Sequence, residues 1–175
     1  MDSNFLLILT GPTASGKTAV FTELAKKYPH LSRVITTTTR PPRQDEVDGK
    51  DYYFLSQDTF EKMIADDQFI EYVQIYSSTY YGTTKAEIEK VFENRSLIWI
   101  VDVTRAAKVG EFFQSSFDPD VARQLIEKTL VIYIDSPQDV IRQRLIKRGM
   151  NEVSVGKRIQ EDTQNWEQLK DHFKN

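Results

Sequence analysis

The sequence contains no cysteine, and this absence excludes two kinds of stabilising chemistry. None of its 175 residues can form a disulfide or bind a metal through a thiolate. That composition fits a reducing compartment, and we expect a cytoplasmic protein. The first residues carry no positively charged stretch, and the first apolar run, Phe5–Leu9, is too short for a signal peptide.

Long hydrophobic runs and an excess of positive charge are also missing. No apolar stretch approaches the length of a membrane span. The net charge is −3, which argues against a general nucleic-acid binder. Hydrophobic residues make up 39% of the chain, as in an ordinary globular protein, and the length suits one domain with a substantial core. We therefore expect neither a nucleic acid nor a membrane among its partners.

Three uninterrupted apolar runs are present, at Phe5–Leu9, Leu97–Val101 and Leu130–Ile134. Each has the length of a strand and is rich in β-branched or aromatic residues. Such runs are typical of strands buried on both faces, in a parallel sheet covered by helices. Helical patterns follow them, and this alternation predicts an α/β fold with a parallel core sheet.

The segment from Val34 to Tyr81 has a different pattern. Tyr52–Leu55 and Phe69–Ile75 are predicted to be short strands, and a helix is expected to begin at Ser56 between them. These elements indicate a small mixed insert in the core fold.

The last third of the sequence predicts helices. Ser136 and Pro137 are typical of an N-cap and a first-turn proline, so we expect a helix over Gln138–Lys147. Asn151–Phe173 predicts a final polar helix. The stretch Gly110–Glu127 is expected to be a surface helix or a contact site.

One loop carries a specific motif. The sequence GPTASGKT fits G-x-x-x-x-G-K-[ST] and lies between a predicted buried strand and an amphipathic helix. Its glycines allow successive backbone N–H groups to converge on phosphate oxygens, and the positive end of the following helix adds to them. The loop therefore predicts a site for the phosphates of a nucleoside triphosphate, which the resemblance described below implies to be ATP. The residues expected to bind them are Gly11, Pro12, Thr13, Ala14, Ser15, Gly16, Lys17 and Thr18, with the Thr18 hydroxyl as a ligand of Mg²⁺.

The amino-acid sequence of this loop closely resembles that of the phosphate loop of tRNA dimethylallyltransferases. That family is longer, and no other part of its pattern is found here. The loop by itself therefore indicates a class of ligand and leaves the reaction open.

A second group of phosphate-binding side chains follows the loop. Arg40 and Arg43 lie in a segment rich in threonine and pinned by two prolines. Guanidinium groups match phosphate oxygens in two-point geometry, and tyrosine hydroxyls further along can add contacts. Taken singly, the arginines could also be solvated loop charges and the tyrosines core aromatics.

With these motifs the chain resembles guanylate kinase over about residues 5–160. The resemblance is carried by the phosphate loop, the block Thr38–Arg43, the stretch Glu46–Phe54, and the segments Phe69–Glu71 and Tyr80–Thr83. It implies a P-loop NTPase three-layer fold. A core of about residues 1–33, 84–136 and 159–175 would carry a nucleotide-monophosphate-binding insert over about 34–83 and a helical lid over about 137–158.

The resemblance also implies the reaction, which is ATP-dependent phosphorylation of GMP or dGMP with Mg²⁺. The residues implied for the GMP phosphate are Arg40, Arg43, Tyr52 and Tyr81. Those implied for guanine are Thr36, Glu71, Thr83 and Asp102. Asp102 is also a candidate for holding the water shell of the metal.

A basic stretch lies where the family has its lid. From Arg142 to Arg158 there are six basic residues and one acid. The resemblance assigns Arg144, Arg148 and Arg158, together with Lys17, to stabilising the transferring phosphoryl group. A solvated basic helix is the alternative reading of this stretch.

The chain departs from the family pattern in three places. Ile100 replaces an acid, and Thr104-Arg105 replaces a Gln-Gly pair, so base affinity or selectivity could differ. An extra residue near Ser77–Thr79 leaves the choice between Tyr80 and Tyr81 open. A short strand and a closing helix are missing at the C-terminal end.

These departures leave several alternatives open. Because of the C-terminal departure, we expect a sheet without one edge strand, in a monomer or a homodimer. For the function, the alternatives are a kinase of the same fold acting on another phosphorylated acceptor, and a non-catalytic guanylate-kinase-like binding module.

Overall fold

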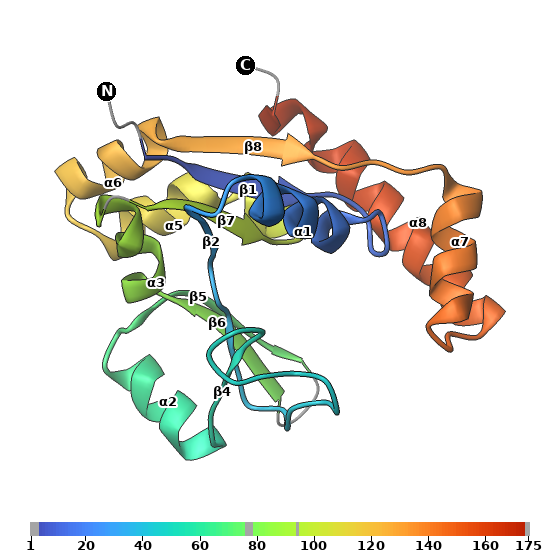
Figure 1. Cartoon of the computed structure of the whole chain (residues 1–175), viewed down its shortest axis with the longest axis horizontal. Helices are drawn as coiled ribbons and strands as arrows, with labels where there is room; N and C mark the ends of the chain where they lie inside the picture. The colour runs from blue at the N-terminus through green and yellow to red at the C-terminus, as the bar shows by residue number, and fades with distance from the viewer. Residues whose placement is uncertain (1–3, 76–78, 94, 174–175) are drawn as a thin grey trace.

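The computed structural model of the protein describes residues 4–75, 79–93 and 95–173 and has an α/β fold (Figure 1). Its main sheet has four parallel strands in the order β2-β7-β1-β8. Their bounds are Leu31–Arg33 for β2, Ser96–Ile100 for β7, Leu6–Thr10 for β1 and Thr129–Tyr133 for β8. The three predicted strands are each found one residue away from their expected bounds, so the parallel core sheet is confirmed.

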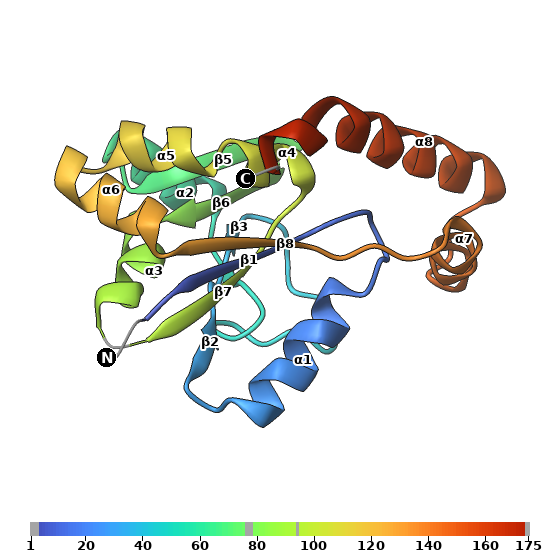
Figure 2. The same ribbon diagram turned by 90° about the horizontal axis from the view of Figure 1, so that it is seen from above.

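Helices cover both faces of this sheet. Alternate side chains of a strand point to opposite faces, so β1 contributes to two separate cores. Leu6 packs on the side of α5 (Val109–Ser116) and α6 (Pro119–Glu127), whereas Leu7 packs on the side of α1 (Lys17–Lys27). Figure 2 shows α1 on one side of the sheet and the α5–α6 pair on the other. This arrangement is the predicted three-layer fold.

The stretch Gly110–Glu127, expected to be a surface helix or a contact site, lies in the α5–α6 pair. Phe113 and Leu125 are fully buried against the sheet strands, whereas most of the other side chains of the stretch are exposed. The stretch therefore forms two surface helices whose inner face packs on the core.

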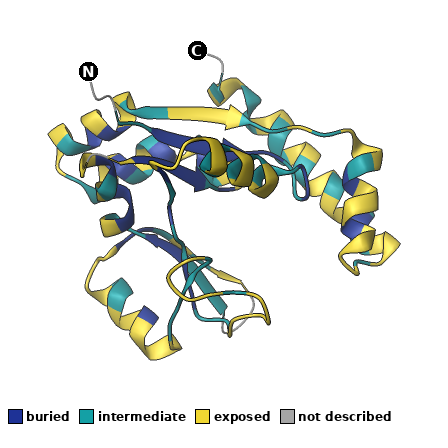
Figure 3. Ribbon diagram, in the orientation of Figure 1, coloured by how far each residue is buried: buried dark blue, intermediate teal, exposed yellow. Residues whose placement is uncertain are grey.

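The strand β8 differs from the prediction of burial on both faces. Leu130 is 60% exposed and Ile132 is 45% exposed. Figure 3 shows most of this strand in the colour of exposed residues. In the described sheet β8 pairs with β1 and ends the strand order, so its apolar side chains lack the cover that a central strand receives. Near its end, Tyr133 stacks on Trp166 of α8 (Glu152–Leu169), with ring centroids 3.7 Å apart.

The insert forms a second sheet, and its mixed character is confirmed. The strand order is β4-β3-β6-β5, with β3 and β4 parallel and the other pairs antiparallel. The bounds are Thr37–Thr38 for β3, Tyr53–Phe54 for β4, Phe69–Ile75 for β5 and Thr79–Thr84 for β6. Between β4 and β5 lies α2 (Gln57–Ala65), and the Ser56 hydroxyl caps it by accepting the amide of Thr59. Ser77 and Ser78, where an extra residue was inferred, lie outside the described residues.

The remaining helices connect these parts. Their bounds are Lys85–Glu89 for α3, Lys90–Phe92 for the 3-10 helix η2, Val103–Ala107 for α4, Gln138–Lys147 for α7 and Lys170–Phe173 for the 3-10 helix η3. No helix in the described part of the chain has an apolar stretch that could cross a membrane.

One capping prediction is wrong. The N-cap of α7 is Pro137, which has no side-chain acceptor for it. The hydroxyl of Ser136 is engaged elsewhere, since it donates to the carbonyl oxygen of Ser15 at 2.8 Å.

Candidate active site

The phosphate loop joins β1 to α1, as its motif predicts. Gly11 has φ 137°, and a Cβ there would lie 2.1 Å from the carbonyl oxygen of Ile134. Gly16 has φ 115° and is the N-cap of α1. Both positions require glycine because L side chains rarely adopt such backbone angles. The glycines therefore fix the loop at the positive end of the helix, where anions bind.

Lys17 is folded back on this loop. Its ammonium group donates hydrogen bonds to the carbonyl oxygens of Gly11 and Pro12, each at 2.8 Å. Burial lowers the pKa of Lys17, and the nearby carboxylates of Asp162 and Asp102 oppose that effect. The lysine is thus held at the loop, in contact with backbone groups that a phosphate would replace.

Two of the predicted lid arginines contact the loop. Arg144 on α7 donates to the carbonyl oxygens of Ala14 and Ser15 at 3.0 Å. Arg158 on α8 donates through Nε to the Thr13 hydroxyl at 2.8 Å. Both guanidinium groups therefore come from distant parts of the sequence to the same loop.

The third predicted lid arginine lies further out. Arg148 is the C-cap of α7 and is exposed. Its charge, like that of Arg158, contributes to lowering the pKa of Lys17. The structure therefore brings its charge near the loop, while the loop contacts are made by Arg144 and Arg158.

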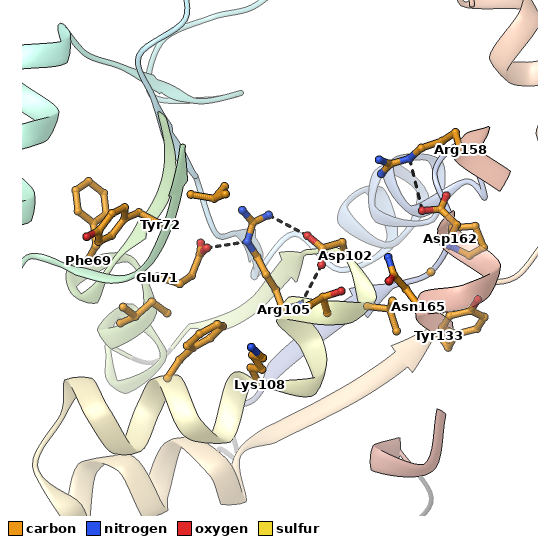
Figure 4. Close-up of a pocket in the computed structure, with 17 residues that line it drawn as sticks. Phe69, Glu71, Tyr72, Asp102, Arg105, Lys108, Tyr133, Arg158, Asp162 and Asn165 are labelled. Atoms are coloured by element: carbon orange, nitrogen blue, oxygen red, sulfur yellow. Dashed lines mark hydrogen bonds and ion pairs between the residues drawn. The ribbon is translucent and has the colours of Figure 1, made fainter. Parts of the chain in front are cut away.

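Asp162 at the loop was missed by sequence reasoning. Its Oδ2 accepts the backbone N–H of Thr13 at 2.7 Å, and its Oδ1 lies 3.5 Å from Nε of Arg158 (Figure 4). The carboxylate thus accepts a hydrogen bond from one of the backbone N–H groups of the phosphate loop. The available signal was its spacing, because Asp162 follows Arg158 by one helical turn.

Arg40 and two tyrosines form a cluster in the insert. The guanidinium carbon of Arg40 lies 4.9 Å from the ring centroid of Tyr52, and its Nε donates to the Tyr81 hydroxyl at 3.1 Å. Tyr80 instead stacks on Phe60, with ring centroids 5.1 Å apart. This geometry favours Tyr81 over Tyr80 as the tyrosine of the site. Arg43 is exposed, beside the cluster.

Glu46 is a second residue that sequence reasoning did not single out. Its two carboxylate oxygens accept NH1 and NH2 of Arg40 at 2.5 and 2.6 Å, and it also accepts the amide of Arg43. These hydrogen bonds lower the pKa of Glu46 to about 2 and raise the pKa of Arg40. The signal in the sequence was an acid close to two arginines in one loop.

A cavity of about 400 Å³ lies next to this cluster. Its lining includes Tyr52, Tyr81, Thr36, Thr83, Glu71, Trp99, Ile100 and Arg105. Glu71 on β5 is only 6% exposed and accepts the hydroxyl of Thr83, which is fully buried, at 2.8 Å. Burial raises the pKa of Glu71, and the Arg105 charge opposes that rise. The cavity therefore combines a buried carboxylate with aromatic and hydroxyl groups.

The predicted residue Asp102 lies at the end of β7, beside this cavity. Its side chain caps α4 by accepting the amide of Arg105 at 3.0 Å. A second cavity of about 610 Å³ extends from Asp102, Glu71 and Arg105 to Gly11 and Arg158 (Figure 4). The phosphate loop and the Glu71 site are thus connected through one open space.

Comparison with known proteins gives a family for this arrangement. The sequence model of the guanylate kinase family matches residues 3–174. The chain belongs to the guanylate kinase family. The match extends far beyond the phosphate loop, so the loop's likeness to tRNA dimethylallyltransferases does not extend to the rest of the chain.

Individual guanylate kinases agree with this assignment. The chain is 32% identical to a guanylate kinase of Clostridium perfringens over 145 residues, which cover 82% of this chain and 61% of that protein. It is 32% identical to one of Carboxydothermus hydrogenoformans over 171 residues, which cover 97% of this chain and 76% of that protein. The crystal structure of guanylate kinase from Anaplasma phagocytophilum shares the fold, with a TM-score of 0.58 and 20% identity over 83% of this chain and 67% of that one.

Two residues at which the chain departs from the guanylate kinase pattern, Ile100 and Arg105, lie at the Glu71 cavity. Ile100 lines it in place of an acid, and Arg105 forms part of its wall. Sequence reasoning noted Arg105 only as a departure. The structure places its guanidinium group directly on Glu71.

Proposed function

We propose that this chain transfers the γ-phosphoryl group of ATP to GMP or dGMP. One observation carries the proposal. One cavity is lined by the buried carboxylate of Glu71 and by the two tyrosines that hold Arg40, and it shares Glu71 and Arg105 with a second cavity that reaches the phosphate loop. Such a cavity suits a ligand that has a hydrogen-bond-donating base and a phosphate.

The residues divide by the chemistry of GMP. Guanine presents N–H donors on one edge and an acceptor at O6, so Glu71, Asp102 and the threonine hydroxyls suit it. The phosphate suits Arg40, whose guanidinium is already oriented by Tyr52 and Tyr81. The full proposed set for GMP is Thr36, Arg40, Arg43, Tyr52, Glu71, Tyr81, Thr83 and Asp102.

The loop Gly11–Thr18 would bind the phosphates of ATP. Mg²⁺ usually takes one or two protein oxygens, with waters and phosphate oxygens completing six ligands. The exposed Thr18 hydroxyl in the first turn of α1 fits that role, and the half-exposed Asp102 carboxylate fits contact through water. Within the described residues no cluster of three acidic or histidine side chains forms a metal site, so most ligands would come from ATP and water.

The proposed chemistry needs no protein nucleophile. A phosphate oxygen of GMP attacks the γ-phosphorus in line, the new O–P bond forms, and the bond to the β–γ bridging oxygen breaks to release ADP. Lys17, Arg144, Arg148 and Arg158 supply positive charge around the transferring group, and Mg²⁺, when bound, would neutralise charge on the phosphates. Lys17 would leave the carbonyl oxygens of Gly11 and Pro12 to reach them.

The proposal keeps the domain division inferred from the sequence. The insert over about 34–83 holds the acceptor, and the lid over about 137–158 closes on the donor. It also keeps the expectation of a monomer or homodimer. The expected location in the cytoplasm is supported by the absence of cysteine.

The test is ADP formation from ATP and Mg²⁺ with GMP, dGMP, AMP, UMP and ribose phosphates as separate acceptors. We expect turnover with GMP and dGMP only. Lys17→Ala should lower kcat/KM by about 10²-fold or more while the protein stays folded. Turnover confined to another acceptor would favour the same-fold kinase, and GMP binding without turnover would favour a binding module.

A further inference from the structure

Arg105 holds both of the carboxylates that the proposed function assigns to guanine. Its Nε lies 2.7 Å from Oε2 of Glu71, and its NH1 lies 3.0 Å from Oδ2 of Asp102. Figure 4 shows the side chain reaching from α4 between the two acids. One guanidinium group therefore occupies the acceptors of the base subsite.

Glu71 has little room for another donor while Arg105 is in place. Its Oε1 accepts the hydroxyl of the fully buried Thr83, and its Oε2 is paired with Arg105. The Glu71 side chain is 6% exposed, whereas that of Arg105 is 26% exposed. Arg105 is the long, partly exposed partner, so it is the one that can leave.

The group that Arg105 presents resembles the edge of guanine. A guanidinium offers N–H donors on a planar N–C–N unit, and guanine offers N1–H and N2–H₂ on a unit of the same kind. Both therefore make charge-assisted hydrogen bonds to the same carboxylate. Adenine has an acceptor at N1 and cannot replace these donors.

Space for the displaced side chain lies next to it. Arg105 and Glu71 line both the 400 Å³ cavity and the 610 Å³ cavity, so they stand between the two. The larger cavity also borders Asp102, Lys108 and Phe112. Arg105 can withdraw into it and keep its contact with Asp102, whose side chain is 46% exposed.

We infer that Arg105 is an internal competitor for the base, held on Glu71 in the free protein and displaced when guanine binds. This inference rests on the proposed function. It makes Arg105 a specificity-determining residue, because a base that presents an acceptor, where guanine presents N1–H, cannot replace the hydrogen bond that Arg105 gives up on Glu71.

The first experiment measures GMP binding to the full chain by calorimetry, which needs no turnover. Arg105→Gln should bind GMP about tenfold more tightly, the gain expected when a competing state that holds about nine-tenths of the molecules is removed. Lys108→Gln removes the same charge near the larger cavity and should bind GMP as the wild type does. Weaker or unchanged GMP binding by Arg105→Gln would overturn the inference.

The second experiment uses the guanidinium ion itself as a probe. In Arg105→Ala, low millimolar guanidinium chloride should weaken GMP binding competitively, while sodium chloride at equal ionic strength should not. The wild type should respond equally to the two salts. An equal response of variant and wild type to guanidinium contradicts the competitor role. Thermal melting shows whether each variant is folded, and Arg105→Met, which removes the guanidinium but keeps a long side chain, replaces any variant that is not.

The two proposals fail in different ways. If Arg105→Gln binds GMP more tightly but neither protein forms ADP with GMP, the kinase proposal fails and the competitor role stands. If GMP turnover is found and Arg105→Gln raises the Kd for GMP, the competitor role fails alone. If no protein binds GMP, both are wrong.

Discussion

At the scale of single residues, charged groups of the site already have partners within the chain. Arg40 is paired with Glu46, and Glu71 is paired with Arg105. Lys17 is bonded to backbone carbonyl groups of its own loop. Ligand binding would therefore exchange internal contacts for ligand contacts. The exchanges at Arg40 and Glu71 depend on the protonation state of the acid involved.

The pH dependence of GMP binding follows from Glu71. This carboxyl must be ionised to accept N1–H of guanine, and burial raises its pKa above the ordinary 4.5. We expect GMP affinity to be constant near neutral pH and to fall as the pH drops towards the raised pKa. Below it, affinity should fall about tenfold per pH unit. Binding titrations between about pH 5 and about pH 8 measure this fall.

Glu71→Gln is the control for this pH profile. It cannot ionise at this position, so it should bind GMP about 10- to 100-fold more weakly at neutral pH and lose the component due to Glu71. The GMP phosphate titrates near pH 6 in both proteins, and comparison of the two curves removes its effect. Identical curves for the wild type and the variant would rule out Glu71 as the base reader.

At the scale of elements, α7 and α8 act together on the phosphate loop. Arg144 and Arg158 reach it from different helices, and Asp162 binds its backbone. The contacts link α7 and α8 to the phosphate loop. Arginines on the same helix can therefore be expected to differ sharply in importance.

Arg144 and Arg142 provide a matched pair on α7. Arg144 contacts the loop, whereas Arg142 pairs with Glu152 at the surface. Arg144→Gln should lower kcat by about 10- to 1000-fold with a smaller change in the KM for ATP, because its charge acts mainly on the transition state. Arg142→Gln should stay within about twofold of the wild type, since exposed ion pairs contribute little. Steady-state kinetics measure kcat and KM for both variants. An equal loss of kcat in the two variants would exclude the specific role of Arg144.

At the scale of the whole molecule, the position of each strand in the sheet decides how much it stabilises the fold. The strand β1 is central and β8 ends the strand order. Leu7 and Leu130 are register partners on these two strands, yet Leu7 is 7% exposed and Leu130 is 60% exposed. The same substitution at both positions therefore isolates the effect of burial.

We expect Leu7→Ala to lower the free energy of unfolding by about 2–5 kcal/mol through lost burial and a residual cavity. Leu130→Ala should change it by less than about 0.5 kcal/mol. Urea unfolding followed by circular dichroism measures both. A loss at Leu130 as large as that at Leu7 would mean that β8 is covered in solution.

Local patterns in the sequence were sufficient to predict most of this architecture. The apolar runs marked the strands, and the phosphate-loop motif located the strand–loop–helix unit around Lys17. They could not distinguish β8 from a central strand, because an apolar run has the same sequence whether or not a neighbour covers it. Ser136 and Asp162 were misassigned or missed because each also contacts the phosphate loop, which is far away in the sequence. Glu46 was missed because its pairing with Arg40 follows no regular helix or strand spacing. The contact between Arg105 and Glu71 is likewise fixed only when α4 and β5 meet in the fold.

The stack of Trp166 on Tyr133 gives the molecule a built-in optical signal. The sequence has two tryptophans, and the other, Trp99, lines the cavity beside Glu71. In Trp166→Phe, the remaining indole emission comes from the wall of the base cavity, so a change on nucleotide addition reports arrival of the base. In Trp99→Phe, the emission comes from the contact of Trp166 on α8 with Tyr133 on β8 and reports changes in that contact. Stopped-flow traces of the two variants would therefore time these two events separately, without any attached dye.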